Sequence, residues 1–166
     1  PLTQIRTVAE TALDEVIGLR GRDELEKVMF AEDDLAAAQV AKGLREMGVS
    51  AAFSAESLSI APLMLTVFGR LMDKLAKRGL LTAKNGIYTP TAEFIPAADS
   101  AEKLLRDFIT GHPGHLPEGL LCASSCGELG AILTGEKDAV QVLFGGTNAE
   151  LLDHFYGDGL LSSHWM

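Results

Sequence analysis

Apolar residues recur at helical spacing along most of this chain, and this periodicity restricts the fold more than any other feature. Steps of three or four residues place side chains on one face of an α-helix. The clearest stripe follows Pro62 and consists of Leu65, Phe68, Leu71, Met72 and Leu75. Two further stripes are Leu35, Ala38, Ala41 and Leu44, and Leu104, Leu105, Phe108 and Ile109. Since 47% of the 166 residues are hydrophobic, the chain can bury a core, and we predict a mainly α-helical, bundle-like lobe.

Glycines indicate where these helices end. Gly48, Gly79 and Gly111 each follow an apolar stripe, which is the position where glycine commonly ends a helix. Gly18 and Gly21 interrupt a weaker stripe nearer the start of the chain. That early region therefore favours two short helices over one.

Short polar side chains are predicted to cap several helices. Asp33 or Asp34 precedes the stripe that begins at Leu35 and can act as its N-cap. Asp99 and Glu102 have the spacing of a capping box, and Asn148 precedes the last helical segment. Each of these side chains is expected to accept a hydrogen bond from a free backbone N–H at a helix start.

One short segment departs from the helical pattern. Residues 80–90 read as two brief strands joined by Asn85-Gly86, the two-residue turn favoured because both positions tolerate positive φ. A helix followed by a small hairpin is the outline of a winged helix. The sequence therefore predicts one small β-hairpin within a winged-helix-like section.

No internal repeat or low-complexity linker divides the chain. We expect one helical domain over residues 1–166, with the first helices and the winged-helix-like section in 1–95 and the remaining helices in 96–166. No apolar run approaches the roughly 18 to 20 residues of a membrane span. The first residues also lack the pattern of a signal peptide, so we expect a cytoplasmic protein without membrane contact.

The charge balance argues against a nucleic-acid partner. The helix before the hairpin carries Arg70, Lys74, Lys77 and Arg78, as a DNA-binding winged helix would. The chain as a whole has 23 acidic and 14 basic residues, which gives a formal net charge of −9. Because phosphate neutralisation dominates binding to DNA, we expect no nucleic-acid binding.

The sequence offers no recognisable catalytic or cofactor-binding motif. A dinucleotide or S-adenosylmethionine site needs a glycine-rich turn between a buried strand and a helix. Gly127 and Gly130 stand among helix formers, and Gly145-Gly146 follows no β-branched strand. We therefore assign no catalytic, cofactor-binding or metal-binding residue within this chain.

Two pairs of residues could suggest a metal site, but their setting favours a structural role. Cys122 and Cys126 are four residues apart, so both thiols lie on one face of a helix and are expected to be packed and free. His112 and His115 stand beside prolines in a turn. Neither pair has the further ligands that zinc requires nearby in the sequence.

The last third of the chain carries a more specific pattern. Its elements are Cys126-Gly-Glu-Leu, Leu133-Thr-Gly-Glu and Leu143-Phe144-Gly-Gly, after earlier elements at Leu44 to Gly48, at Leu80, Leu81, Tyr88 and Pro90, and at His112 to Gly114. This sequence resembles the N-terminal helical lid subdomain of a polyketide synthase C-methyltransferase. The family usually reads Leu-Phe-Pro-Gly-Gly, and this chain lacks the proline.

The resemblance implies a lid over a Rossmann-like core that binds S-adenosylmethionine and methylates the α-carbon of a carrier-bound β-ketoacyl chain. The core and its catalytic base would lie beyond Met166. By the same resemblance, the segment with Phe155, Tyr156, His164 and Trp165 leads towards the cleft. These four aromatic residues are the candidates for a cleft or an interface, although aromatic side chains more often pack in a core or between lobes.

Two hypotheses remain open. In the first, the chain is a non-catalytic lid of a carrier-dependent methyltransferase. In the second, it is a vestigial methyltransferase lobe that serves as a structural or docking module for another assembly-line enzyme. The expected partners are the rest of a polyketide synthase module, an acyl carrier protein and such a separate enzyme.

Overall fold

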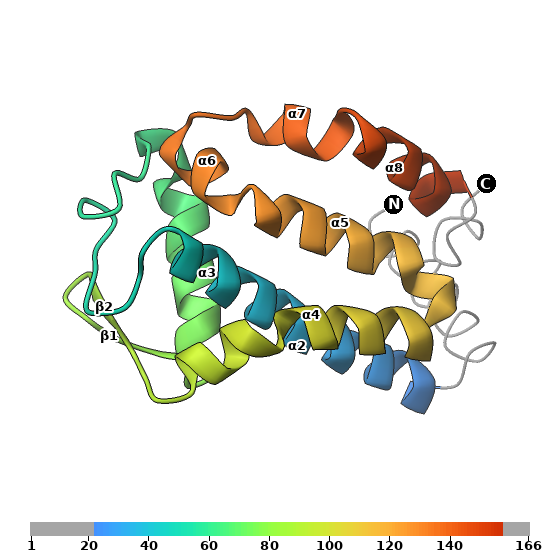
Figure 1. Cartoon of the computed structure of the whole chain (residues 1–166), viewed down its shortest axis with the longest axis horizontal. Helices are drawn as coiled ribbons and strands as arrows, with labels where there is room; N and C mark the ends of the chain where they lie inside the picture. Colours follow the sequence, from blue (N-terminus) through green and yellow to red (C-terminus); the bar gives the residue numbers. More distant parts are fainter. Residues whose placement is uncertain (1–21, 158–166) are drawn as a thin grey trace, which may run out of the picture.

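The computed structural model describes residues 22–157, and helices make up most of it (Figure 1). The helices are α2 (Arg22–Glu46), α3 (Leu65–Lys77), α4 (Phe94–Gly111), α5 (Leu116–Gly127), α6 (Leu129–Thr134), α7 (Ala139–Phe144) and α8 (Thr147–Gly157). Two 3₁₀ turns, η1 (Pro62–Met64) and η2 (Pro113–His115), precede α3 and α5. The strands β1 (Leu81–Lys84) and β2 (Ile87–Pro90) form an antiparallel hairpin. The predicted mainly α class is confirmed.

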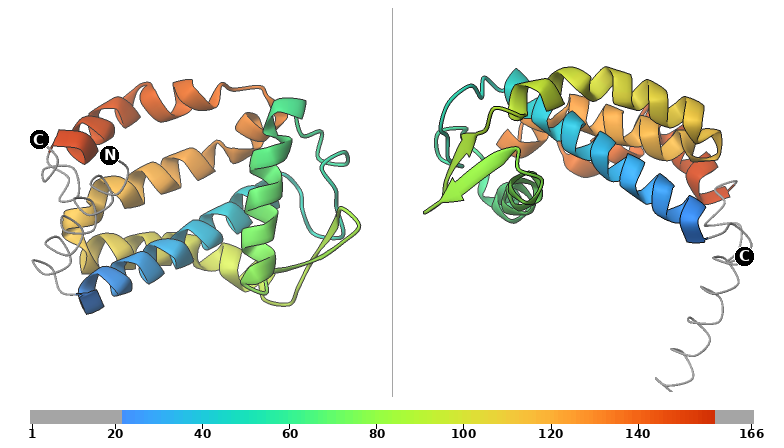
Figure 2. Two further views of the ribbon diagram at one scale, coloured as in Figure 1. Left: turned by 180° about the vertical axis from the view of Figure 1, so that it is seen from behind. Right: turned by 90° about the horizontal axis from the view of Figure 1, so that it is seen from below.

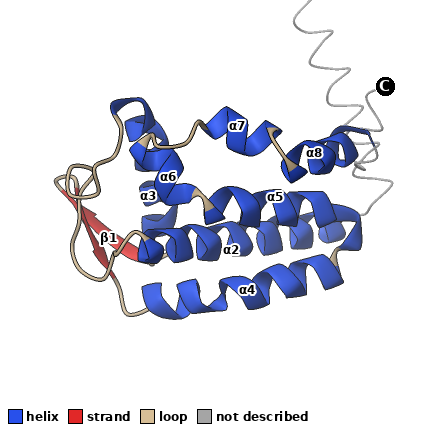
Figure 3. Ribbon diagram, turned by 45° about the horizontal axis from the view of Figure 1, so that its top comes forward, coloured by secondary structure: helices blue, strands red, loops and turns tan. Residues whose placement is uncertain are grey.

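The long helices α2, α4 and α5 pack on one another, and α3 runs across their ends (Figures 1 and 2). The hairpin extends from α3 at the same end of the molecule. Helices α7 and α8 form a row along α5 (Figure 3). The molecule therefore has a helical scaffold with one outer row of short helices.

The main core lies where α2, α3, α4 and the hairpin meet. Its largest fully buried members are Leu44, Met72, Leu75, Phe94 and Leu133. A smaller cluster of Val28, Leu35 and Phe108 lies towards the other end of α2. Both clusters contain residues of α2 and α4, so these two helices bring the two ends of the scaffold together.

Small residues allow the scaffold helices to approach closely. Ala37 and Ala41 of α2, and Ala98 and Ala101 of α4, are buried. A Cβ at Gly43 would lie 2.9 Å from Cδ2 of Leu129 and 3.1 Å from the carbonyl oxygen of Cys126, so a larger residue would force neighbours to shift where α2 meets α5 and α6. The seam between α2 and α4 is consequently narrow, and small side chains fill it.

The predicted hairpin and several helix stops are confirmed. Asn85 and Gly86 have φ values of 53° and 76°, as a two-residue turn of this type requires. Gly48 (φ 90°) follows α2 and Gly79 (φ 73°) follows α3. Gly111 is the last residue of α4. These signals are local, and the structure obeys them.

Aromatic packing attaches the hairpin to α3. Tyr88 of β2 forms a β-bridge with Phe53, and both rings pack against Phe68 of α3. This is a helix with a small hairpin attached, and the comparison with a winged helix stays a prediction. The division of the chain into 1–95 and 96–166 also stays a prediction.

Two predicted capping positions are wrong. Helix α2 starts at Arg22 and passes through Asp33 and Asp34 without a break, so neither residue caps a helix. Helix α4 starts at Phe94, which places Asp99 a turn and a half inside it. The predicted capping box therefore does not exist.

The acidic residues of α4 bind α2 instead. Arg45 forms an ion pair with Asp99, and Lys42 pairs with Glu102 across the seam. The hydrogen bond from Lys42 is the main reason that the pKa of Glu102 lies below its ordinary value.

Of the helices described here, none has the length and hydropathy needed to cross a membrane.

Candidate functional site

A hollow of about 440 Å³ lies among the described residues. It lies between the end of α5, the connection from α6 to α7, helix α7 itself and the turn into α8. The residues lining it are Ser124, Glu128, Glu136, Lys137, Asp138, Gln141, Val142, Gly145, Gly146 and Asn148. It is a polar and open surface site.

Glycines shape the turn at one edge of this hollow. A Cβ at Gly145 would lie 2.4 Å from the carbonyl oxygen of Gln141, so no other residue fits there without backbone movement. Gly146 adopts a φ of 57°. The turn leaves helix α7 rather than a strand, so it does not fit the phosphate- or nucleoside-binding turn of a Rossmann-like core.

Asn148 joins α7 to α8, but it does not cap α8 as predicted. Helix α8 starts one residue earlier, at Thr147, and Asn148 is 5% exposed. Its Nδ2 donates a hydrogen bond to the carbonyl oxygen of Val142 at 2.7 Å. The side chain therefore satisfies a carbonyl near the end of the preceding helix.

Charged residues form the opposite edge of the hollow. Asp138 caps α7, with its Oδ1 accepting from the backbone N–H groups of Val140 at 2.8 Å and Gln141 at 3.0 Å. Lys137 Nζ lies 2.8 Å from Glu128 Oε1. The lining carries the acids Glu128, Glu136 and Asp138 against this one lysine. Such a site suits cationic or hydrogen-bonding groups better than anions.

The structure places the predicted cleft residues only in part. Phe155 and Tyr156 lie in the last turns of α8. Phe155 follows Asn148 by seven positions in α8, a rise of about 10 Å, so Phe155 and Tyr156 do not lie at the turn beside the hollow. His164 and Trp165 lie outside the described residues.

The two thiols are free and partly buried on one face of α5, as predicted. The hydrogen bond from Cys126 is the main factor that lowers the pKa of Cys122. The same bond, together with burial, raises the pKa of Cys126. Cys122 packs in the small core cluster and Cys126 against the main one, which is a structural environment for both.

The two histidines have local partners. His115 Nδ1 lies 3.1 Å from Glu118 Oε1, and the His112 ring packs on Phe108 with centroids 5.4 Å apart. The described residues contain no group of three or more potential metal ligands. These histidines stabilise the junction between α4 and α5.

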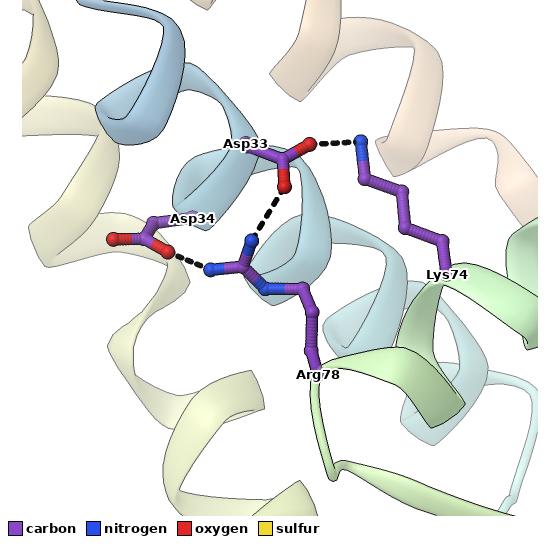
Figure 4. A network of polar contacts seen from close by, with 4 residues as sticks. All are labelled: Asp33, Asp34, Lys74 and Arg78. Carbon is purple, nitrogen blue, oxygen red and sulfur yellow. Dashed lines mark hydrogen bonds and ion pairs between the residues drawn. The ribbon is translucent and has the colours of Figure 1, made fainter. Parts of the chain in front are cut away.

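A second polar cluster joins α2 to α3 (Figure 4). Asp33 contacts both Lys74 and Arg78, and Arg78 also contacts Asp34. The hydrogen bond from Lys74 is the main reason that the pKa of Asp33 is lowered. Sequence analysis identified all four residues and assigned none of them to this network, because the pairing depends on the packing of α3 across α2.

The hollow was also missed from the sequence. Glu128 and Glu136 belong to motifs that carried the family resemblance, and Gly145-Gly146 was recognised only as a turn. The available signal was the density of such motifs in one segment. Sequence spacing alone does not reveal that this segment folds around a common depression.

No protein-family model matches the sequence, and no curated protein matches it. Solved structures do match. The CurJ carbon methyltransferase shares the fold with a TM-score of 0.74 and 20% identity, over 96% of this chain and 44% of that one. The DszA carbon methyltransferase has a TM-score of 0.76 and 18% identity, over 93% of this chain and 40% of that one. The CMeT domain of the citrinin polyketide synthase has a TM-score of 0.78 and 20% identity, over 98% of this chain and 45% of that one.

Nearly the whole chain therefore has the fold of one part of these carbon methyltransferases, and it spans less than half of their length. This confirms, for the fold, the resemblance inferred from the sequence.

Proposed function

We propose that this chain is the helical accessory subdomain of a carbon-methyltransferase domain in a polyketide synthase. The observation that carries the proposal is the match of 93–98% of the chain to only 40–45% of three such structures. A segment that matches a part so completely is best understood as that part. By resemblance, we place it at the N-terminal side of the domain, as a lid.

In this proposal the chain itself is non-catalytic. S-adenosylmethionine would be held by the remainder of the domain, where the methyl group would be transferred to a carrier-bound β-ketoacyl chain. The Gly145-Gly146 turn does not fit that cofactor, since it leaves a helix. The role left to the described residues is to shape and cover a neighbouring surface.

The partners in this proposal are the rest of the synthase module and its acyl carrier protein, in the cytoplasm. The apolar side chains of Leu63 and Phe144, which are 89% and 52% exposed, are consistent with contacts to further protein surfaces. We treat residues 1–166 as one helical unit, because α2, which precedes the boundary expected near residue 95, packs against α4, α5 and α6, which extend beyond it.

Calorimetry with S-adenosylmethionine tests this division of labour. We expect residues 1–166 alone to give no binding heat, and a longer polypeptide that continues past Met166 to bind in the micromolar range. Saturable binding by residues 1–166 would overturn the non-catalytic assignment.

The second candidate function is a docking module retained without an active catalytic half. The exposed apolar residues favour it as much as the lid, because both roles need a contact surface. If the longer polypeptide also fails to bind S-adenosylmethionine but binds another enzyme of the same assembly line, the docking function is correct and the lid function is wrong.

A further inference from the structure

Helix α3 is basic although the chain is acidic. Between Leu65 and Arg78 there are four cationic residues and one acidic residue, Asp73. The chain as a whole carries a formal net charge of −9. An acidic partner would thus be repelled by most of this protein and attracted to α3.

Two of these four cationic residues already form ion pairs within the protein. Lys74 and Arg78 pair with Asp33 and Asp34 of α2 (Figure 4). Arg70 and Lys77 are exposed, and neither has an ion-pair partner among the described residues. Both cations remain available to a partner, and the exposed Asp73, one turn from each of them on the same face, lowers the net charge of that face to +1.

Apolar side chains continue the same face. Arg70 follows Val67 by three positions and Lys77 follows it by ten. This spacing places all three residues on one side of a helix. Leu63 lies one turn before Val67, in η1, which leads directly into α3. Leu63 is 89% exposed and Val67 is 46% exposed.

We call Leu63, Val67, Arg70 and Lys77 the α3 outer stripe. The opposite face of α3 is fully engaged, since Phe68, Met72 and Leu75 belong to the main core. The stripe thus has an apolar end and a cationic end, and it stands on a helix fixed both by the core and by the ion pairs to α2.

We propose that the α3 outer stripe docks a helix of a partner protein that presents carboxylates beside an apolar side chain. The carboxylates would pair with Arg70 and Lys77, and the apolar side chain would pack on Leu63 and Val67. The identity of the partner rests on the proposed function, under which it is the acyl carrier protein that delivers the substrate.

The composition of the stripe favours a protein over a nucleic acid. Binding to a duplex relies on neutralising several phosphates, and only two cations of α3 are free of intramolecular ion pairs. Leu63 and Val67 would gain nothing from a phosphate backbone. Two other exposed apolar pairs also stand beside acids and would repel the same partner. Met29 and Phe30 on α2 lie with Glu26 and Asp33, and Val140 and Phe144 on α7 lie beside the acids of the hollow.

A titration of the isotope-labelled chain with a carrier protein of the same assembly line, followed by NMR, tests the surface. We expect shift changes centred on α3, and about five- to tenfold weaker binding for both Arg70→Glu and Lys77→Glu. Lys103→Glu is the matched control, because it makes the same charge change on exposed α4 and should leave the affinity unchanged.

Leu63→Ser tests the apolar end, with Val140→Ser as its control on α7. Both side chains are highly exposed, so neither change should affect folding. Only Leu63→Ser should weaken binding, by about fivefold. Raising the salt concentration should weaken binding to the unmodified chain and should have little effect on Arg70→Glu.

The outcomes separate the surface from the proposed function. If Arg70→Glu and Lys103→Glu bind the carrier equally, the stripe is wrong and the proposed function stands. If the carrier does not bind but a synthetic acidic amphipathic peptide binds at α3, the surface is right and the partner is wrong. If neither probe binds, or if a DNA duplex binds more tightly, the docking proposal is overturned.

Discussion

The part of the chain before residue 112 and the part after it contribute very differently to the core. Before residue 112, α2, α3, α4 and the hairpin supply most of the buried apolar side chains. After it, only Leu129, Leu133 and Leu152 are buried apolar residues among the described side chains. Helix α7 buries none of its six residues.

The difference teaches that the motifs of the last third add little to the core, to which they contribute Leu129 and Leu133, whereas the earlier motifs contribute Leu44, Leu80 and Leu81. Glu128, Glu136 and Gly145-Gly146 of the motifs of the last third line the hollow, beside the outer row of α7 and α8. The first part forms the scaffold that supports this row. The scaffold is expected to determine stability, and the outer row is expected to open first.

Truncating one phenylalanine in each part should give the largest contrast. Phe94 is fully buried in the main core, so Phe94→Ala should lower the free energy of unfolding by about 3 to 5 kcal/mol. Phe144 on α7 is 52% exposed, and Phe144→Ala should cost less than about 1 kcal/mol. Urea denaturation measures both. Equal losses would mean that α7 belongs to the core.

Hydrogen exchange tests the same contrast without mutation. Amides in the middle of α2 and α4 should exchange only through global unfolding, because buried side chains surround them. Amides of α7 should exchange through local opening, with protection lower by at least about tenfold. Uniform protection across α2 and α7 would contradict the two-part description.

Gly145→Ala should damage the outer row selectively. The new Cβ would meet the carbonyl oxygen of Gln141 at 2.4 Å, so the turn must move, at a cost of about 1 to 3 kcal/mol. Gly127→Ala is the control, since its Cβ would meet nothing within 4 Å. Near-ultraviolet circular dichroism and hydrogen exchange of α7 would locate the damage. An unchanged α7 would show that the turn tolerates a side chain.

The smallest effect concerns the ion pairs between α2 and α3. Asp33→Asn should lower the free energy of unfolding by at most about 1 kcal/mol, because both partners are partly exposed. Since the pKa of Asp33 is lowered in the folded state, its contribution is present above the ordinary carboxyl range near pH 4 and disappears as the pH falls through the lowered value.

Thermal unfolding at neutral pH and near pH 2 would check this dependence, with Asp73→Asn as the control. The control residue is exposed on α3 outside the network of Figure 4. A difference between Asp33→Asn and the unmodified chain that persists near pH 2 would show that the lost stability does not come from the carboxylate charge.

Features that depend on local backbone geometry were predictable from the sequence. The Asn85-Gly86 turn and the stops at Gly48 and Gly79 need positive φ, and residue type alone reports that need. The prediction that the apolar stripe of α3 is buried was only partly correct. Phe68, Met72 and Leu75 are buried, whereas Leu65 is 48% exposed because it stands at the start of the helix.

Acidic side chains were harder to interpret. The residues Asp33, Asp34, Asp99 and Glu102 were assigned to helix starts, and all four pair with cations of another helix. An N-cap is a local signal, whereas an ion pair between helices depends on which faces meet after packing. The sequence alone does not show which helix faces pack together, so it does not show which charged residues pair.

The pairs across α2 and α4 also have a consequence for alignment. The buried alanines of these two helices are small, and the larger buried residues Leu44 and Phe94 lie beside them in the main core. The two helices are antiparallel, so Arg45 lies one turn after Lys42 on α2, whereas its partner Asp99 lies one turn before Glu102 on α4. A slide of one helix along the other in either direction would separate both pairs, so the two ion pairs favour the same axial position as the buried core residues do.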